Sequence, residues 1–320
     1  MNRREFIRNT GVGGATLGLF PADLSSIQRT MAPGKIEKRA LGKTGETLSM
    51  IGFGGIVVMN ATTEEAATRV AEAIDKGINY FDVAPSYGNA EVMLGPALEP
   101  YRKGVFLACK TTERTAVGAA KELEQSLKNL RTDHFDLYQL HAVEKPEDVE
   151  TILGPGGALE TFVSAREAGK VRFLGFSAHS VEAALALIKS FDFDTILFPV
   201  SFSTWYAGNF GPEVLDAAQK KQMGILALKA MAKSRIPQGE AKPYAKCWYT
   251  PLDDPESALQ GLRFTLSHPV TAAIPPGEEK LFRMALELAP KFTPLSREET
   301  EAIKIEAMKL DPIFRYPRQA

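Results

Sequence analysis

Short runs of apolar, β-branched and aromatic residues alternate along this chain with longer amphipathic stretches. This alternation is typical of parallel β-strands joined by helices. Eight strands with helices between them favour an α/β fold of the closed (β/α)8 type, the TIM barrel. The runs that predict strands are residues 51–55, 79–84, 105–110, 135–141, 171–177, 195–202, 224–231 and 270–275.

The helical intervals between these runs carry end signals. Thr62 and Glu65 have the spacing of a capping box, and Gly77 stands where glycine ends a helix. Ser180 and Asp254 are each placed as N-caps. An open doubly wound sheet is the alternative fold, but the G-x-G-x-x-G sequence that usually follows its first strand is missing here.

Three further segments lie outside the strand and helix alternation. Extended patches at residues 35–42 and 47–50 flank a turn-forming sequence and predict a β-hairpin that caps the barrel. Residues 232–253 form a long, polar connection with several aromatic residues, which favours a lid, a loop packed at the surface being the alternative. Ile303 and Met308 lie among charged residues and predict an extra C-terminal helix.

The first thirty residues have a different character. Arg3 and Arg4 form a twin-arginine export motif, and a weakly apolar, glycine-rich stretch follows at residues 10–20. This pattern predicts recognition by the twin-arginine export machinery and a periplasmic location, or a cytoplasmic one if the leader is not functional. A basic N-terminus with a chance arginine pair is the alternative.

Composition narrows the possible functions. The chain has 320 residues, of which 44% are hydrophobic and 24% charged, with a net charge of -1. Because there is no basic excess, we do not expect nucleic acid or anionic membranes as partners. The two cysteines, Cys109 and Cys247, and the four histidines lack the spacings of metal sites, so we predict no metal. A single disulfide bridge stays open.

Four residues could carry chemistry. In a barrel, catalytic groups stand where strands end and in the loops that follow. Asp82, Lys110 and His141 each come at the end of an apolar run, and Tyr87 follows Asp82 by five positions. Taken singly, each has a structural explanation, as an ion pair, a core histidine or a loop aromatic. Their shared position at one end of neighbouring strands favours a catalytic group of four.

The pairing of these residues suggests a mechanism. Asp82 and Lys110 would form an ion pair that keeps Lys110 protonated beside Tyr87, and the ammonium would favour ionisation of the phenol. Tyr87 would then act as a general acid, and His141 would hydrogen-bond the same substrate oxygen.

The chain resembles the aldo-keto reductase superfamily. The resemblance spans about residues 35–290 and rests on Asp82 within residues 81–84, Tyr87 within residues 87–91, Lys110, His141 within residues 139–141, and the turn sequence at residues 41–45. It implies that these four residues are the catalytic tetrad, with tyrosine as the acid. We therefore divide the chain into a leader (1–30), a barrel (35–290) and a C-terminal helical extension (291–320).

The resemblance also implies a nicotinamide cofactor, although several positions depart from the family pattern. Ser177 matches a carboxamide-binding serine, but Ala178 replaces the asparagine that follows it, and Lys229 stands roughly where many relatives stack a tyrosine. Expected cofactor contacts are Gly54, Ser177, His179, Ser201, Lys229, Pro276, Gly277, Lys280 and Arg283.

These departures bear on which nicotinamide is bound. Glu278 and Glu279 would repel a 2'-phosphate unless Lys280 and Arg283 neutralise them. NADP is the family's usual cofactor, and NAD stays open. The expected reaction is reduction of an aldehyde or ketone, a sugar or keto-sugar among the candidates, or the reverse oxidation of an alcohol. The alternative is a non-catalytic, nicotinamide-binding regulatory barrel.

Overall fold

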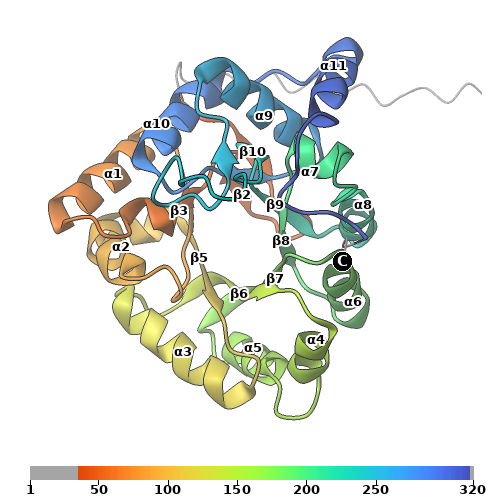
Figure 1. Cartoon of the computed structure of the whole chain (residues 1–320). Coiled ribbons are helices and arrows are strands. Elements are labelled where there is room, and N and C mark those ends of the chain that lie inside the picture. The colour runs from red at the N-terminus through yellow and green to blue at the C-terminus, as the bar shows by residue number, and fades with distance from the viewer. Residues whose placement is uncertain (1–34, 318–320) are drawn as a thin grey trace, which may run out of the picture. The chain divides into compact units, whose positions relative to one another are not determined.

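The computed structural model describes residues 35–317, and the predicted leader lies outside them. Eight parallel strands form one sheet in the order β12-β9-β8-β7-β6-β5-β4-β3. A parallel bridge between Ile51 and Ala273 joins its two edges. The predicted (β/α)8 barrel is therefore confirmed, and Figure 1 shows its helices surrounding the strands. The strands are β3 Phe53–Gly54, β4 Tyr80–Asp82, β5 Phe106–Thr111, β6 Phe135–Val143, β7 Val171–Ala178, β8 Thr195–Pro199, β9 Gly224–Leu228 and β12 Ala272–Ile274.

Helices follow the strands as the sequence pattern predicts. Thr62 and Glu65 form the capping box of α1, and Ser180 and Asp254 cap α6 and α9 through their side chains. The α-helices are α1 Thr63–Asp75, α2 Ala90–Leu98, α3 Ala116–Asn129, α4 Pro146–Leu153, α5 Ala158–Glu167, α6 Val181–Ser190, α7 Phe202–Tyr206, α8 Pro212–Lys220, α9 Pro255–Ser267, α10 Glu279–Leu288 and α11 Arg297–Ala307. Short 3-10 helices are η1 Gly55–Val58, η2 Glu99–Gly104 and η3 Ala289–Lys291.

Apolar side chains of the barrel divide into two clusters. One fills the space between the sheet and the helices. The other fills the barrel interior, where Tyr80, Phe106, Leu137, Leu197 and Leu226 meet. Because successive side chains of a strand point to opposite faces, residues two positions further along point inward as well. On three neighbouring strands the inward positions end in polar residues: Asp82 on β4, Lys110 after Ala108 on β5, and Gln139 and His141 on β6.

A hairpin closes one end of the barrel, as predicted. It consists of β1 Lys38–Ala40 and β2 Thr47–Ser49, which pair antiparallel. Leu41 and Leu48 are fully buried and belong to the interior cluster. The hairpin therefore covers the ends at which the barrel strands begin.

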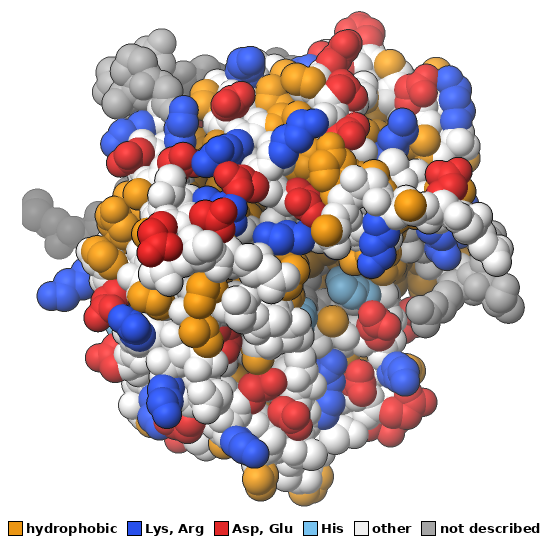
Figure 2. Space-filling view, turned by 60° about the vertical axis from the view of Figure 1, so that its left-hand side comes forward, with side chains coloured by type: hydrophobic (Ala, Val, Ile, Leu, Met, Phe, Trp, Pro, Cys, Tyr) orange, Lys and Arg blue, Asp and Glu red, His pale blue; other side chains and the backbone are white. Residues whose placement is uncertain are grey.

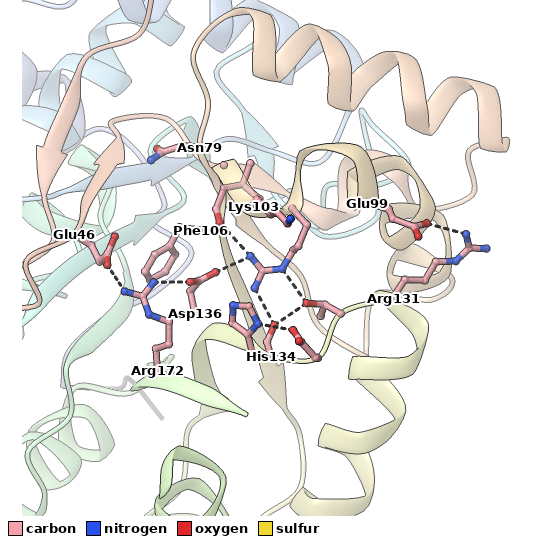
Figure 3. Close-up of a pocket in the computed structure, with 14 residues that line it drawn as sticks. Glu46, Asn79, Glu99, Lys103, Phe106, Arg131, His134, Asp136 and Arg172 are labelled. Atoms are coloured by element: carbon pink, nitrogen blue, oxygen red, sulfur yellow. Dashed lines mark hydrogen bonds and ion pairs between the residues drawn. The ribbon is translucent and has the colours of Figure 1, made fainter. Parts of the chain in front are cut away.

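A cavity of about 830 Å³ lies beside this closed end. Asp136, at the start of β6, binds two guanidinium groups in it: Arg102 Nη1 at 3.1 Å and Arg172 Nη1 at 2.7 Å. Figure 3 shows the Asp136 carboxylate between these groups, with Glu46 on the far side of Arg172. Since these arginines and carboxylates neutralise one another and lie at the ends where strands begin, the network stabilises the fold and offers no unpaired charge to a ligand.

Two predicted strands end three residues earlier than expected. The run at residues 195–202 forms a strand only to Pro199, because Ser201 caps α7. The run at residues 224–231 stops at Leu228, since Lys229 adopts a left-handed backbone with φ of 71°. Both chain reversals depend on backbone geometry that a hydrophobic run does not encode.

The connection at residues 232–253 contains a small sheet of its own. Its strands are β10 Ala232–Ser234 and β11 Thr250–Pro251, paired antiparallel. In Figure 1 this connection lies over the end of the barrel near β9 and β3. Among residues 35–317, no helix combines the length and apolar character needed to cross a bilayer.

Candidate active site

Three adjacent strands carry inward polar residues at the end opposite the hairpin. Asp82 ends β4, Lys110 lies near the end of β5, and His141 follows Gln139 by two positions on β6. The strand register pairs Asp82 with Ala108, and Lys110 with Gln139. Because parallel strands bring their carboxyl ends to the same edge, these residues meet at the open end of the barrel.

Asp82 and Lys110 form a buried ion pair. Lys110 Nζ contacts Asp82 Oδ1 and donates to the Val83 carbonyl oxygen at 3.2 Å. Two more donors reach Asp82 Oδ2: Tyr80 Oη at 3.0 Å and Gln139 Nε2 at 2.9 Å. These contacts offset the free-energy cost of burying the Asp82 carboxylate. Burial lowers the pKa of Lys110, but the Asp82 carboxylate and Tyr87 outweigh it, so the ammonium form is favoured.

Tyr87 follows β4 in a tight loop and lies beside this pair. Its Oη is 3.5 Å from Lys110 Nζ, and the ammonium lies 5.1 Å from the centre of the ring. Burial raises the pKa of Tyr87, and the charge of Lys110 opposes that rise without cancelling it. Lys110 therefore lowers the pKa of Tyr87, as expected, but burial has the larger effect and the net change is upward. Tyr87 remains protonated at neutral pH, the form a general acid requires.

His141 completes the group. Its ring lies edge-on to Tyr87, with 5.6 Å between ring centres. Its Nδ1 is 3.2 Å from Ser86 Oγ. Burial, followed by the positive charge of Lys110, lowers the pKa of His141 to about 3. The imidazole is therefore neutral at physiological pH and can offer one N–H donor.

A cavity of about 110 Å³ opens beside Asp82 and Tyr87. The connection at residues 232–253 covers it with Lys246, Trp248 and Tyr249, and the ends of β3, β8, β9 and β12 supply the remaining wall. Lys246 Nζ donates to the Ile56 carbonyl oxygen at 3.0 Å, which ties the connection to the loop after β3. The geometry thus agrees with the predicted lid. Figure 2 shows a hollow in one face of the molecule in which a histidine side chain is visible.

Comparison with known proteins identifies the family. The model of the aldo/keto reductase family matches residues 50–272. The chain belongs to the aldo/keto reductase family. It is 23% identical over 304 residues to the uncharacterized oxidoreductase YqkF of Bacillus subtilis, covering 84% of this chain and 96% of that protein.

Other aldo/keto reductase relatives agree. L-Galactose dehydrogenase of Arabidopsis thaliana is 33% identical over 158 residues, covering 45% of this chain and 49% of that enzyme. Among solved structures, the holo form of aldo-keto reductase AKR11C1 from Bacillus halodurans superposes with a TM-score of 0.67 at 23% identity, covering 88% of this chain and 99% of that one. At this identity the superposition supports the fold alone.

Four of the predicted cofactor residues of this aldo/keto reductase line the cavity: Gly54, Lys229, Pro276 and Gly277. Lys229, expected roughly where many relatives stack a tyrosine, packs against aromatic rings of the connection at residues 232–253. Its Nζ lies 4.7 Å from the ring centre of Trp248 and 4.5 Å from that of Tyr249. It forms no ion pair or hydrogen bond with the described residues, and burial lowers its pKa to about 8.

The other five predicted cofactor residues do not line this cavity. Ser177 Oγ accepts the N–H of Ala142, and His179 contacts Glu144 and stacks on Phe314. Ser201 is buried, and its hydroxyl caps α7. Residues 280 and 283 lie on the exposed side of α10, and there Arg283 binds Glu72 and Glu279. They therefore do not line the cavity.

Several residues of the site were not predicted from the sequence. Tyr80 and Gln139 precede Asp82 and His141 by two positions, so strand alternation alone could have placed them inward. Ser86 directly precedes Tyr87, but nothing in the sequence indicates its contact with His141. The contact of Lys246 with the loop after β3 spans 190 positions and has no local signal.

Proposed function

We propose that this aldo/keto reductase uses a nicotinamide cofactor to reduce an aldehyde or ketone to an alcohol. The observation that carries the proposal is the position of Tyr87 beside a charged, buried Lys110 at the mouth of the barrel. A structural ion pair would need neither a tyrosine hydroxyl at the ammonium nor a cavity beside it. The name of one relative, L-galactose dehydrogenase, supports the same class of reaction.

Each of the four residues then has a definite task. Tyr87 gives its proton to the substrate oxygen, and the Lys110 ammonium stabilises the phenolate that remains. Asp82 holds Lys110 in its charged form. His141 donates a hydrogen bond to the same oxygen from its neutral ring, which orients the carbonyl and stabilises the negative charge developing on it.

The cavity is chemically suited to a dinucleotide. Leu197, Leu228 and Ile274 offer apolar surface to a nicotinamide ring, and the unpaired Lys229 ammonium offers charge to a phosphate. When bound, this cofactor supplies the hydride. At about 110 Å³ the cavity is smaller than the roughly 300 Å³ or more of typical ligand pockets. We therefore expect residues 232–253 to move when the cofactor binds.

We propose NADP as the cofactor, with NAD as the alternative. NADP is the usual choice in proteins that this chain resembles, whereas the engagement of Arg283 with Glu72 and Glu279 favours NAD. Titration of the purified protein with NADPH and with NADH, followed by tryptophan fluorescence, measures both dissociation constants. A lower dissociation constant for NADH than for NADPH would overturn the assignment of NADP.

The decisive experiment compares the wild type with Tyr87→Phe. Oxidation of NADPH or NADH is followed with a panel of aldehydes, ketones and sugars. We expect the variant to lose at least about a hundredfold in kcat, because it lacks the proton donor, and to bind cofactor as the wild type does. Equal turnover by the two proteins would overturn the assignment of Tyr87.

The same experiment tests the alternative, a nicotinamide-binding barrel without catalysis. Such a protein would bind the cofactor and show no turnover with any carbonyl. The buried Asp82–Lys110 pair argues against it, because binding alone gives no reason to hold an ammonium beside Tyr87.

We propose a sugar or keto-sugar as the substrate class. A second cavity of about 660 Å³ shares Trp248 with the first and is also lined by His179, Phe314 and Tyr316. Aromatic rings of this kind stack on the faces of pyranose rings, and Arg235 and Glu182 offer polar partners for hydroxyl groups. Comparing kcat/KM for aldoses with that for alkyl aldehydes of similar size tests the proposal.

We also propose that residues 1–30 direct export through the twin-arginine machinery to the periplasm. The arginine pair and the apolar stretch that follows it support this proposal. A fusion of residues 1–30 to a reporter that fluoresces after folded export measures it. Replacement of Arg3 and Arg4 by lysine is expected to keep the reporter in the cytoplasm.

A further inference from the structure

His141 stands at an irregular point of β6. The pairing of β6 with β7 shifts its register between Leu140 and Val143. Ala142, which lies within the shift, has a left-handed backbone with φ of 49°. Residues with a side chain rarely adopt this conformation, and they keep it only where surrounding contacts enforce it. The peptide that carries the catalytic histidine therefore depends on contacts from other elements.

Two side chains supply these contacts. Arg114, in the loop after β5, donates from Nη2 to the carbonyl oxygen of His141 at 2.8 Å. Ser177 Oγ, on β7, accepts the N–H of Ala142 at 2.7 Å. The guanidinium is itself held from the other side, because its Nε lies 3.5 Å from the carboxylate of Asp148. Arg114 thus links the start of α4 to the histidine peptide.

Ser86 provides a third contact, with the imidazole itself. Its Oγ is 3.2 Å from Nδ1 of His141. A neutral imidazole has one nitrogen that donates and one that accepts. The serine hydroxyl can take either role, and when it donates to Nδ1 the ring proton lies on Nε2. Burial disfavours a second proton on the ring, and the charges of Lys110, His179 and Arg114 act in the same direction. Nδ1 of His179 lies 3.3 Å from Glu144 Oε1.

We propose that Ser86 and Arg114 are positioning residues that hold His141 in one place and in one tautomer, with its proton on Nε2. The inference rests on the proposed function, in which His141 donates to a substrate oxygen. A carbonyl oxygen only accepts hydrogen bonds. In a ring protonated on Nδ1, the unprotonated Nε2 is also an acceptor and could not hydrogen-bond the substrate oxygen. In the proposed arrangement Ser86 donates to Nδ1 and so stabilises the tautomer with its proton on Nε2, and Arg114 fixes the backbone that aims the ring.

The variant Ser86→Ala tests the tautomer. Ser86 is exposed, so the fold does not depend on it. Ser164→Ala, which changes an exposed helical serine away from the cavity, is the matched control. We expect kcat to fall about tenfold, the effect of one hydrogen bond, while the melting temperature and cofactor dissociation constant stay unchanged. The control is expected to behave as the wild type.

Nitrogen NMR of protein labelled in its histidine side chains reports the tautomer without any turnover. The chain has four histidines, so the His141 signals can be assigned with a His141→Gln variant. We expect a single tautomer protonated on Nε2 in the wild type and a mixture in Ser86→Ala. A wild-type ring protonated on Nδ1, or an unchanged tautomer together with unchanged kcat in the variant, would overturn the proposal.

The variants Arg114→Gln and Arg114→Lys test the backbone contact. Arg131→Gln is the control, because Arg131 is exposed and pairs only with Glu99 among the described residues. We expect Arg114→Gln to lower kcat about tenfold with less than a twofold change in KM, and Arg114→Lys to recover part of that loss by restoring a charged donor. Equal kcat for Arg114→Gln and Arg131→Gln would exclude this role.

Failure of the inference and failure of the proposed function give different results. If the wild type transfers no hydride to any carbonyl, the proposed function fails, while the NMR signals still decide the tautomer. If the wild type is active, Tyr87→Phe is inactive and Ser86→Ala retains full kcat with an unchanged tautomer, the proposed function stands and the inference fails.

Discussion

Replacing Asp82 with asparagine leaves the buried ammonium of Lys110 without its carboxylate partner. Asp82 is 2% exposed and Lys110 0% exposed, so solvent cannot take over the role of the carboxylate. Asparagine keeps the size and can still accept from Tyr80, but it carries no charge. Removing one partner of a buried ion pair typically costs about 3–5 kcal/mol. Lys110 can release its proton, which reduces the cost of leaving it buried without a partner. We therefore expect the free energy of unfolding to fall by about 3 kcal/mol at neutral pH.

The pH dependence of this loss identifies its cause. In the wild type the pKa of Lys110 is raised above the unfolded value of about 10.4, so the ion pair contributes fully below that pH. In Asp82→Asn only Tyr87 and Cys109 still oppose burial, the largest influence on the pKa of Lys110, and we expect the folded pKa to fall below the unfolded one. The unfolded variant then binds the extra proton, so its stability rises with pH in that interval. The difference in free energy of unfolding between variant and wild type is therefore expected to become smaller from about pH 7 to pH 10.

Urea unfolding, followed through the two tryptophans at several pH values, measures both effects. Asp133→Asn is the control, because its side chain is 94% exposed and pairs only with His134 among the described residues. We expect this control to leave the free energy of unfolding essentially unchanged. A deficit in Asp82→Asn no larger than in the control, or one independent of pH, would refute the reasoning.

Three further predictions concern other parts of the chain. Asp136→Asn weakens the network at the closed end and should lower the free energy of unfolding in urea by about 2 kcal/mol without changing kcat. In Gly277→Ala the new Cβ would lie 2.2 Å from Cγ2 of Ile56; we expect calorimetry to show a loss of about 1–3 kcal/mol, which Ile56→Ala relieves. His141 has a folded pKa of about 3, so the unfolded chain binds its proton first and wild-type stability falls below about pH 6.5. His141→Gln should remove about 3 kcal/mol of that loss by pH 4 in an acid titration followed by circular dichroism.

Local regularities explain why much of the fold could be predicted. Strand alternation repeats every two residues and helix caps involve neighbours within one turn, so both are present in short stretches of sequence. The eight barrel strands, the hairpin and the cap of α1 at Thr62 followed from such patterns. The position of Asp82, Lys110 and His141 at one end of the barrel followed as well, because parallel strands bring their carboxyl ends together.

The sequence alone did not determine which partners these side chains find. Ser201 seemed available to a cofactor, yet its hydroxyl caps α7, and Arg283 finds Glu72 on α1. Likewise Ser86 reaches His141 across 55 positions. Such contacts depend on the spacing and orientation of packed elements, to which every residue of the barrel contributes. The sequence thus determined the order of the strands and the polar residues at their ends, and tertiary packing decided which of those groups face the cavity.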